Sequence, residues 1–247
     1  MKSVSKTGWL GALIACALIA QVQGQQLITN GGFETGFTGW TRASRVGSEG
    51  NWFQQNGTLS PVNGFTVPAP PGGSSAAMTD AGGPGSHVLF QDFVVPMTLG
   101  VTTLRFDLYI QNRATDFFSP ATLDFATTAL NQQFRADILT ASSDPFSVTV
   151  GDVLMNVYQT QPGNPLVSGW VTITVDLTSL LASRGGQTLR LRFAEADNVN
   201  FMVVGVDNVS LTVPEPGTVG LLVGGLGFIG AAALRKRRRS AGESSRA

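Results

Sequence analysis

The stretch TTLRFDLYIQN, residues 102–112, decides the class of fold that this chain is expected to adopt. Its even-numbered positions from 104 to 110 are apolar, namely Leu104, Phe106, Leu108 and Ile110. Arginine, aspartate and tyrosine stand between them. Because successive side chains of a strand point to opposite faces, this alternation predicts a β-strand with one buried face.

Other stretches are equally rich in Val, Ile, Thr and Phe, and clusters of Gly, Pro, Asn and Asp separate them. The predicted strands are residues 86–95, 133–140, 152–160, 169–178, 188–196 and 201–213, with a short one at 75–80 inside a long Gly/Pro-rich loop. Residues 178–187, TSLLASRGGQ, favour a short helical turn ended by Gly185 and Gly186. Many short strands between turns predict a single all-β domain, an antiparallel β-sandwich of about 190 residues.

The N-terminus differs from this body. Lys2 and Lys6 precede an apolar segment, residues 9–20, which predicts a signal peptide over residues 1–24 and therefore export. The only cysteine, Cys16, lies in LIAC, a pattern that also fits a bacterial lipoprotein signal, so lipidation stays open. The body, residues 25–213, has no thiol and can form neither a disulfide nor a zinc–thiolate site.

Charge is distributed unevenly, although the formal net charge of the whole chain is zero. Residues 25–213 contain eight arginines, no lysine and 14 acidic residues, so the body is acidic. An acidic body argues against nucleic acid as a partner, because binding to phosphates needs a basic surface.

Motifs for catalysis are absent from the sequence. The single histidine, His87, has no cysteine partner and no metal-ligand spacing around it. The chain contains neither a Gly-x-Ser-x-Gly elbow nor a phosphate-binding loop that ends in Lys-Ser/Thr. A pair of glycosidase carboxylates depends on their separation in space, which sequence does not give. We expect no catalytic residues and a protein that is not an enzyme.

Two sequences frame the body, LITNGGFETGFTGW at residues 27–40 and GVDNVSLTV at residues 205–213. Together they resemble the galactose-binding-like jelly rolls that include many carbohydrate-binding modules. The resemblance implies that the first and last strands lie side by side. It also implies a structural Ca²⁺ held by Glu34 and Asp207 with backbone carbonyls, which suits the preference of calcium for hard oxygen ligands. The alternative is that these two carboxylates cap turns.

Candidate ligand-binding residues lie in two predicted loops, residues 49–57 and 110–120. They are Trp52, Phe53, Asn112, Arg113, Asp116, Phe117 and Phe118. Aromatic rings beside polar groups can hold a sugar by stacking and hydrogen bonding, but such a loop can equally anchor itself on the sandwich. Trp40 and Trp170 are expected in the core, because a buried indole contributes a large apolar area.

The C-terminal tail contains 16 uncharged residues from Val219 to Leu234. As a helix they would be about 24 Å long, close to the ~30 Å hydrocarbon core of a bilayer. We predict a transmembrane span over residues 217–234. The basic cluster that follows should remain cytoplasmic and leave the sandwich outside. This membrane stop consists of Arg235, Lys236, Arg237, Arg238 and Arg239.

Pro214, Glu215 and Pro216 precede this span. The motif, the span and the basic end together resemble the PEP-CTERM sorting signal of Gram-negative bacteria, over residues 214–247. The resemblance implies a membrane-embedded exosortase that processes the protein during export to the cell surface or the extracellular matrix.

The function expected from these features is that of an exported surface or matrix protein that binds exopolysaccharide or is embedded in it. The inner membrane would hold it transiently as a precursor. One alternative is a purely structural surface protein without a sugar site, and another is a polysaccharide-active enzyme.

Overall fold

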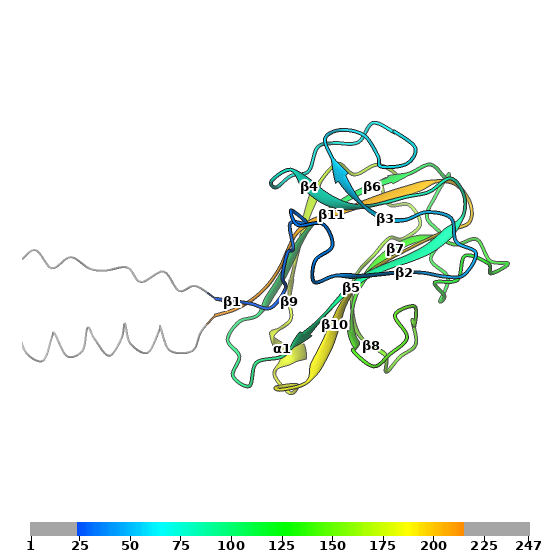
Figure 1. Ribbon diagram of the computed structural model, residues 1–247. Helices are drawn as coiled ribbons and strands as arrows, with labels where there is room; N and C mark the ends of the chain where they lie inside the picture. Colours follow the sequence, from blue (N-terminus) through cyan, green and yellow to red (C-terminus); the bar gives the residue numbers. More distant parts are fainter. Residues whose placement is uncertain (1–23, 215–247) are drawn as a thin grey trace, which may run out of the picture. The chain divides into compact units, whose positions relative to one another are not determined.

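A computed structural model of the protein describes residues 24–214, which fold into two antiparallel β-sheets (Figure 1). The first sheet has the order β3 (Asn51–Asn56), β4 (Ser75–Asp80), β11 (Met202–Val213), β6 (Thr103–Asn112), β9 (Val171–Asp176), with β1 (Gln25–Gln26) also paired to β11. The second has the order β2 (Thr41–Ser44), β5 (Gly85–Val94), β10 (Thr188–Asp197), β7 (Gln132–Thr140), β8 (Val153–Gln159). The single helix of the described residues is α1 (Thr178–Leu181). The predicted antiparallel β-sandwich is confirmed.

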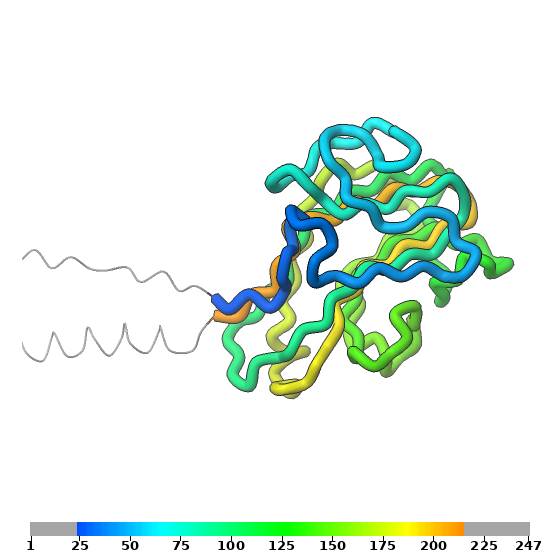
Figure 2. Tube along the Cα trace, viewed as in Figure 1, coloured from blue at the N-terminus to red at the C-terminus, as the bar shows by residue number. Residues whose placement is uncertain are grey.

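Strands β4 to β11 have the order of a jelly roll, with β4-β11-β6-β9 in one sheet and β5-β10-β7-β8 in the other. The chain therefore crosses between the two layers repeatedly (Figure 2). We call one end of the sandwich the tail end; it carries the β5–β6, β7–β8 and β9–β10 connections and both termini of the described chain. The opposite end, the loop end, carries the β2–β3, β4–β5, β6–β7, β8–β9 and β10–β11 connections.

The core forms where the apolar faces of the two sheets meet. The apolar side chains that alternate along β6 are buried as predicted, from Leu104 to Ile110. Phe193 of β10 is fully buried, and its ring lies 5.1 Å from that of Phe106 in the opposite sheet. The ring of Trp40 lies 6.0 Å from that of Phe193, so the predicted core position of Trp40 is confirmed. This core fixes the spacing of the sheets, and with it the position of every loop.

The outer face of the second sheet carries a buried ionic network. Asp137 of β7 is fully buried between Arg135, which binds it through two hydrogen bonds of 2.8 and 2.7 Å, and Arg192 of β10. Burial alone would raise the pKa of Asp137, but the hydrogen bonds and charges of the two arginines lower it overall. Arg192 also donates to the carbonyls of Pro145 and Ser147, so the network ties the β7–β8 loop to the sheet.

The structure differs from two of the predictions made from sequence. Residues 51–56, predicted as loop, form strand β3, because the Trp52 side chain is fully buried in the core and the backbone pairs with β4. Trp170 is only half-buried and lies outside the main core. Its ring lies 5.7 Å from Tyr109 on the outer face of the first sheet, and its indole nitrogen donates to the carbonyl of Ala69.

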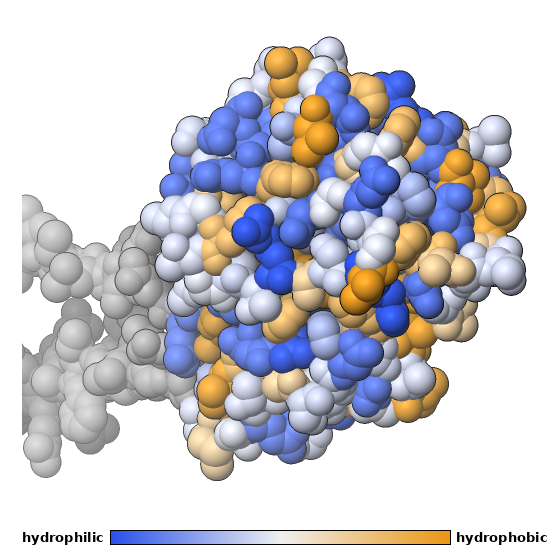
Figure 3. Space-filling view, turned by 45° about the vertical axis from the view of Figure 1, so that its right-hand side comes forward, coloured by the Kyte–Doolittle hydropathy of each residue, from blue (hydrophilic) through white to orange (hydrophobic). Residues whose placement is uncertain are grey.

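Polar and apolar residues are interspersed over the face of the body shown in Figure 3. Within residues 24–214, no helix is long and apolar enough to span a membrane. The predicted signal peptide up to residue 23, Cys16, the predicted span 217–234 and the basic cluster 235–239 lie outside the described residues.

Candidate functional site

Glu34 and Asp207, the two calcium ligands implied by the sequence resemblance, lie on either side of the turn at residues 72–75. The Glu34 carboxylate accepts hydrogen bonds from the backbone N–H groups of Ser74 and Ser75, each 2.9 Å long. Asp207 is fully buried and accepts a 3.1 Å hydrogen bond from the N–H of Gly72. The opening and closing motifs therefore meet at one turn.

Charge around Asp207 is unbalanced in a way that suits a cation. Asp107 of β6 lies directly opposite Asp207 in the register of β11, and like charges in that arrangement repel. Burial raises the pKa of Asp207 to about 7, although hydrogen bonds from Asn208 and Gly72 lower it, and Asp107 and Glu34 raise it further. The side chain of Asn208 donates to Asp107 but carries no charge.

The donor set consists of hard oxygens, which calcium prefers. Among residues 24–214, however, no group of three or more His, Cys, Asp and Glu side chains is arranged to hold a metal ion. A calcium ion between Glu34 and Asp207 would need backbone carbonyls to complete its coordination. The residues fit such an ion only on that condition.

The aromatic residues predicted to bind a ligand do not form one exposed surface. Trp52 and Phe117 are fully buried among the core side chains, so neither is the exposed stacking platform expected from sequence. Phe53 is half-buried on β3, whereas Phe118 is half-buried at an isolated bridge to Gln132.

The polar candidates hold their own loop together. Asn112 is buried and donates to the carbonyl of Asp116, and the Asp116 carboxylate accepts from the N–H of Gly163. The guanidinium of Arg113 lies 3.8 Å from the centre of the Phe65 ring. For Asn112 and Asp116, loop anchoring is the role that the hydrogen bonds support.

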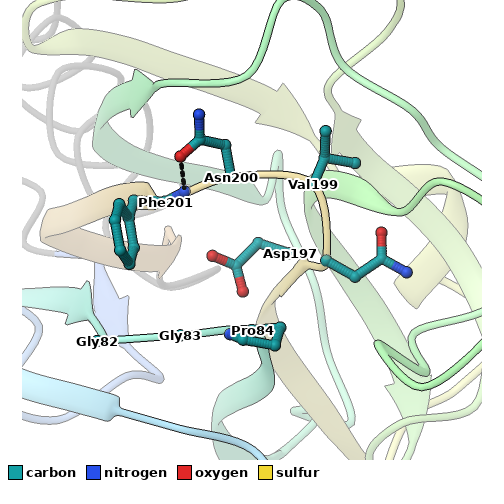
Figure 4. Close-up of a pocket in the computed structure, with 8 residues that line it drawn as sticks. Gly82, Gly83, Pro84, Asp197, Val199, Asn200 and Phe201 are labelled. Atoms are coloured by element: carbon teal, nitrogen blue, oxygen red, sulfur yellow. Dashed lines mark hydrogen bonds between the residues drawn. The ribbon is translucent and has the colours of Figure 1, made fainter.

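A hollow of about 230 Å³ opens at the loop end between the β4–β5 and β10–β11 connections (Figure 4). Eight residues line it: Gly82, Gly83, Pro84, Asp197, Asn198, Val199, Asn200 and Phe201. The Asp197 carboxylate points into the space between Pro84 and the ring of Phe201. The hollow therefore combines an aromatic ring, amide groups and an acidic group.

Asp197 is the most buried polar group of this hollow, with 3% of its surface exposed. It accepts a 2.8 Å hydrogen bond from the N–H of Gly85, which fixes its orientation. Burial raises its pKa to about 7, while backbone hydrogen bonds, including those from Gly85 and Met202, act in the opposite direction. Asn200 is positioned by its own bond to the carbonyl of Arg113, 2.9 Å long.

Two further titratable groups lie on the strands that lead to the hollow. Glu195, two residues before Asp197 on β10, is 1% exposed, and its Oε1 has no hydrogen-bond partner. Burial and the charge of Asp197 raise its pKa well above the usual value. His87 lies opposite Glu195 on β5 and is bonded to the Ser44 hydroxyl and the Glu49 carbonyl. Burial lowers the pKa of His87 to about 4, although its hydrogen bond with the Glu49 carbonyl acts in the opposite direction.

A second cavity, of about 480 Å³, lies where β8 and β9 form one edge of the sandwich. Its walls are largely apolar and include Leu108, Ile110, Phe117, Tyr158 and Ile173. A strongly hydrated ligand such as a sugar is better matched by the hollow at Asp197, which offers charged and amide oxygens. The hollow at Asp197 was not predicted from sequence, because the residues that line it fall in the stretches GGPGS and DNVN, which indicate only turns.

Residues 212–239 match the PEP-CTERM protein-sorting motif. The chain thus carries the C-terminal sorting signal of an exported protein, and the resemblance seen in the sequence is confirmed. The match begins inside β11, at Thr212, so the signal starts where the sandwich ends. No curated protein matches the chain.

Several solved structures resemble the body over most of its length. TmCBM61 in complex with β-1,4-galactotriose is 11% identical, with a TM-score of 0.44 over 76% of this chain and 99% of that one. The K3 adhesin domain of Lys-gingipain from Porphyromonas gingivalis is 15% identical, with a TM-score of 0.42 and coverage of 76% and 97%. A cyclase from Fischerella sp. TAU is 19% identical, with a TM-score of 0.45 and coverage of 78% and 100%. Likenesses at this level assign no function to the chain.

Replacing Asp197 should change how stability depends on pH. The folded-state pKa of Asp197 is about 7, above its ordinary value of 3.8, so this group destabilises the fold progressively as pH rises from about 4 through 7. In Asp197→Asn, the free energy of unfolding should therefore fall less between pH 5 and pH 8 than in the unmodified protein. Urea denaturation at the two pH values measures the difference. Asp144→Asn, at an exposed position, is the control, and equal falls for all three proteins would contradict the assignment.

Proposed function

We propose that the protein is an exported surface or matrix protein whose loop end binds a sugar unit of an extracellular polysaccharide, without catalysis. The observation that carries this proposal is the hollow at Asp197, where an aromatic ring, an amide and a buried carboxylate converge. The resemblance of the framing sequences to carbohydrate-binding jelly rolls supports the same ligand class.

The chemistry of the hollow suits a sugar. A pyranose presents apolar C–H faces and a rim of hydroxyl groups, which fit an aromatic ring and fixed polar groups respectively. Phe201 is half-buried and provides the ring, Asn200 is exposed, and Asp197 accepts hydroxyl hydrogens at the base. The hollow is smaller than the ~300–1,000 Å³ of pockets that enclose a drug-sized molecule, so it favours a single sugar unit or a chain end.

Removal of the aromatic ring should weaken retention on polysaccharide. We expect Phe201→Ala to reduce affinity by about tenfold, the equivalent of ~1.4 kcal/mol, because the stacking surface is lost. Binding is measured by glycan array and by sedimentation with purified polymers, including that of the producing cell. Leu130→Ala removes an exposed apolar side chain outside the hollow and should leave retention unchanged.

Other outcomes of this experiment decide between the alternatives. If the unmodified protein is retained on none of the polymers, the sugar-binding proposal fails and a purely structural surface protein is favoured. If the polymer is shortened and the shortening disappears in Asp197→Asn, the hollow is catalytic and the protein is a polysaccharide-active enzyme.

We also propose that an exosortase-type enzyme of the inner membrane recognises Pro214, Glu215 and Pro216, and removes the tail during export. Mass spectrometry of the surface-exposed protein should find a C-terminus near this motif. Glu215→Ala should accumulate as a membrane-bound precursor, whereas Glu243→Ala, beyond the basic cluster, should be processed normally. A surface form that still ends at Ala247 would contradict the proposal.

A structural calcium ion at Glu34 and Asp207 is a third proposal. The ion would relieve the repulsion between Asp207 and Asp107, and it would link the turn at residues 72–75 to strand β11.

Calcium should therefore raise the melting temperature of protein prepared in chelator. A concentration 100 times the dissociation constant would add about 2.7 kcal/mol to the free energy of unfolding. The gain should be absent in Asp207→Asn and present in Asp92→Asn, whose carboxylate pairs with Arg190 elsewhere on the body. Magnesium at the same concentration controls for ionic strength, and an unchanged melting temperature with calcium would refute the site.

A further inference from the structure

The signal peptide and the transmembrane span that were predicted from sequence adjoin the two ends of the described chain, which lie at one end of the sandwich. Gln25 of β1 pairs with Val213 of β11, so the described chain begins and ends side by side (Figure 2). Four residues separate Pro214 from Val219, the start of the apolar run. Five steps of extended chain cover at most about 18 Å. If the proposed span lies in the bilayer, the tail end of the sandwich must lie close to the lipid surface.

This end carries exposed apolar side chains that the core does not use. In the β5–β6 connection, Val95 is fully buried and Leu99 packs against the core, which anchors the loop. The outward side chains are those of Val94, Met97 and Val101, which are 59%, 81% and 65% exposed. We call these three residues the tail-end patch.

The patch is continuous with the point where the chain leaves the sandwich. A Cβ placed on Gly100 would lie 3.4 Å from the carbonyl oxygen of Pro214, so the loop contacts the last described residue. A Cβ placed on Gly185, in the turn before β10, would lie 3.3 Å from the Cα of Met97, so the loop also packs against that turn. The connection that carries the patch is thus in contact with the point where the tail leaves the sandwich.

Its charge indicates which kind of partner it fits. Residues 94–101, VVPMTLGV, contain no charged side chain. Asp176 and Arg184 occur in the neighbouring β9–β10 region and have opposite signs. The β7–β8 connection, also at the tail end, carries Asp144 and Asp152, so the absence of charge is a property of the patch itself. An uncharged patch that exposes Val and Met matches the boundary between lipid headgroups and acyl chains. Because the tail already tethers the body, the contact is intramolecular and a small apolar area suffices.

We propose that, in the membrane-anchored precursor, Val94, Met97 and Val101 insert into the lipid–water interface of the membrane that holds the tail. This inference rests on the proposed membrane span of residues 217–234. It gives the body a fixed orientation, with the tail end on the lipid and the loop end facing away. Removal of the tail would end the tethering and release the patch from the lipid.

The test uses the full chain with Cys16→Ser, reconstituted in nanodiscs of phosphatidylethanolamine and phosphatidylglycerol. A polarity-sensitive fluorophore is attached to a single reporter cysteine in Met97→Cys, Val101→Cys or Val46→Cys. Val46 is fully exposed in the β2–β3 connection at the loop end and serves as the matched control. We expect a blue shift and quenching by lipids with spin-labelled acyl chains at positions 97 and 101, and neither at position 46.

A second variant separates lipid contact from the behaviour of the dye. With Val94→Ser and Val101→Ser present, the fluorophore at position 97 should lose its blue shift and its quenching, since the rest of the patch no longer inserts. Raising the salt concentration should change neither signal in the parent variant, because the patch is uncharged.

Three results would overturn the inference, and they differ from one another. A chain that does not enter the nanodiscs refutes the membrane span and, with it, the contact. A chain that enters, but whose position 97 behaves like position 46, refutes the contact alone. A blue shift at position 97 that appears only when the processing enzyme is included, without quenching by the spin-labelled lipids, assigns the patch to that enzyme and not to lipid.

Discussion

The pairing of β11 with its three neighbours is the constraint on which the rest of the structure depends. β11 lies between β4 and β6 in the first sheet and also holds β1, so one strand joins the last residues of the body to the first. A bulge between Asp207 and Ser210 interrupts its register with β6, and Asn208 there adopts a positive φ of 50°. The bulge lets Val206 and Val209 both face the core while Asp207 faces the turn at residues 72–75.

The strands that were predicted from sequence are those in which apolar and polar side chains alternate because one face packs into the core, such as β6 and β10. Strands β2 and β3, which were not predicted from sequence, lack this alternation. β2, with the sequence TRAS, and β3, NWFQQN, lie at the edges of their sheets, pair with β5 and β4 through the backbone, and consist largely of polar residues. Backbone pairing leaves little trace in residue type, so a polar edge strand resembles a loop until its partner is known.

The candidate site shows the same limit more strongly. Residue type pointed to Trp52 and Phe117, but the direction of each side chain depends on strand pairing, and both rings lie inside the sandwich. Asp197 and Phe201 were not predicted as site residues, because Asp and Asn in a short polar stretch usually indicate a turn and nothing more. They line a hollow only together with Gly82 and Gly83, which lie more than 110 positions earlier in the chain. The charge repulsion between Asp107 and Asp207 is likewise a product of register, and sequence spacing cannot reveal it.

The topology also separates the two surfaces of interest. Because β1 runs antiparallel to β11 and begins where β11 ends, residues 24 and 214, the two ends of the described chain, both lie at the tail end. The β5–β6 connection at the tail end has no charge, whereas the hollow at the loop end contains a buried carboxylate. A membrane-attached precursor would therefore keep its polar hollow directed toward the solvent. The antiparallel pairing of β1 with β11 places the two ends of the described chain together, whatever the sequences of the loops. The pairing alone would therefore put the proposed membrane tether at the tail end and the hollow at the opposite end.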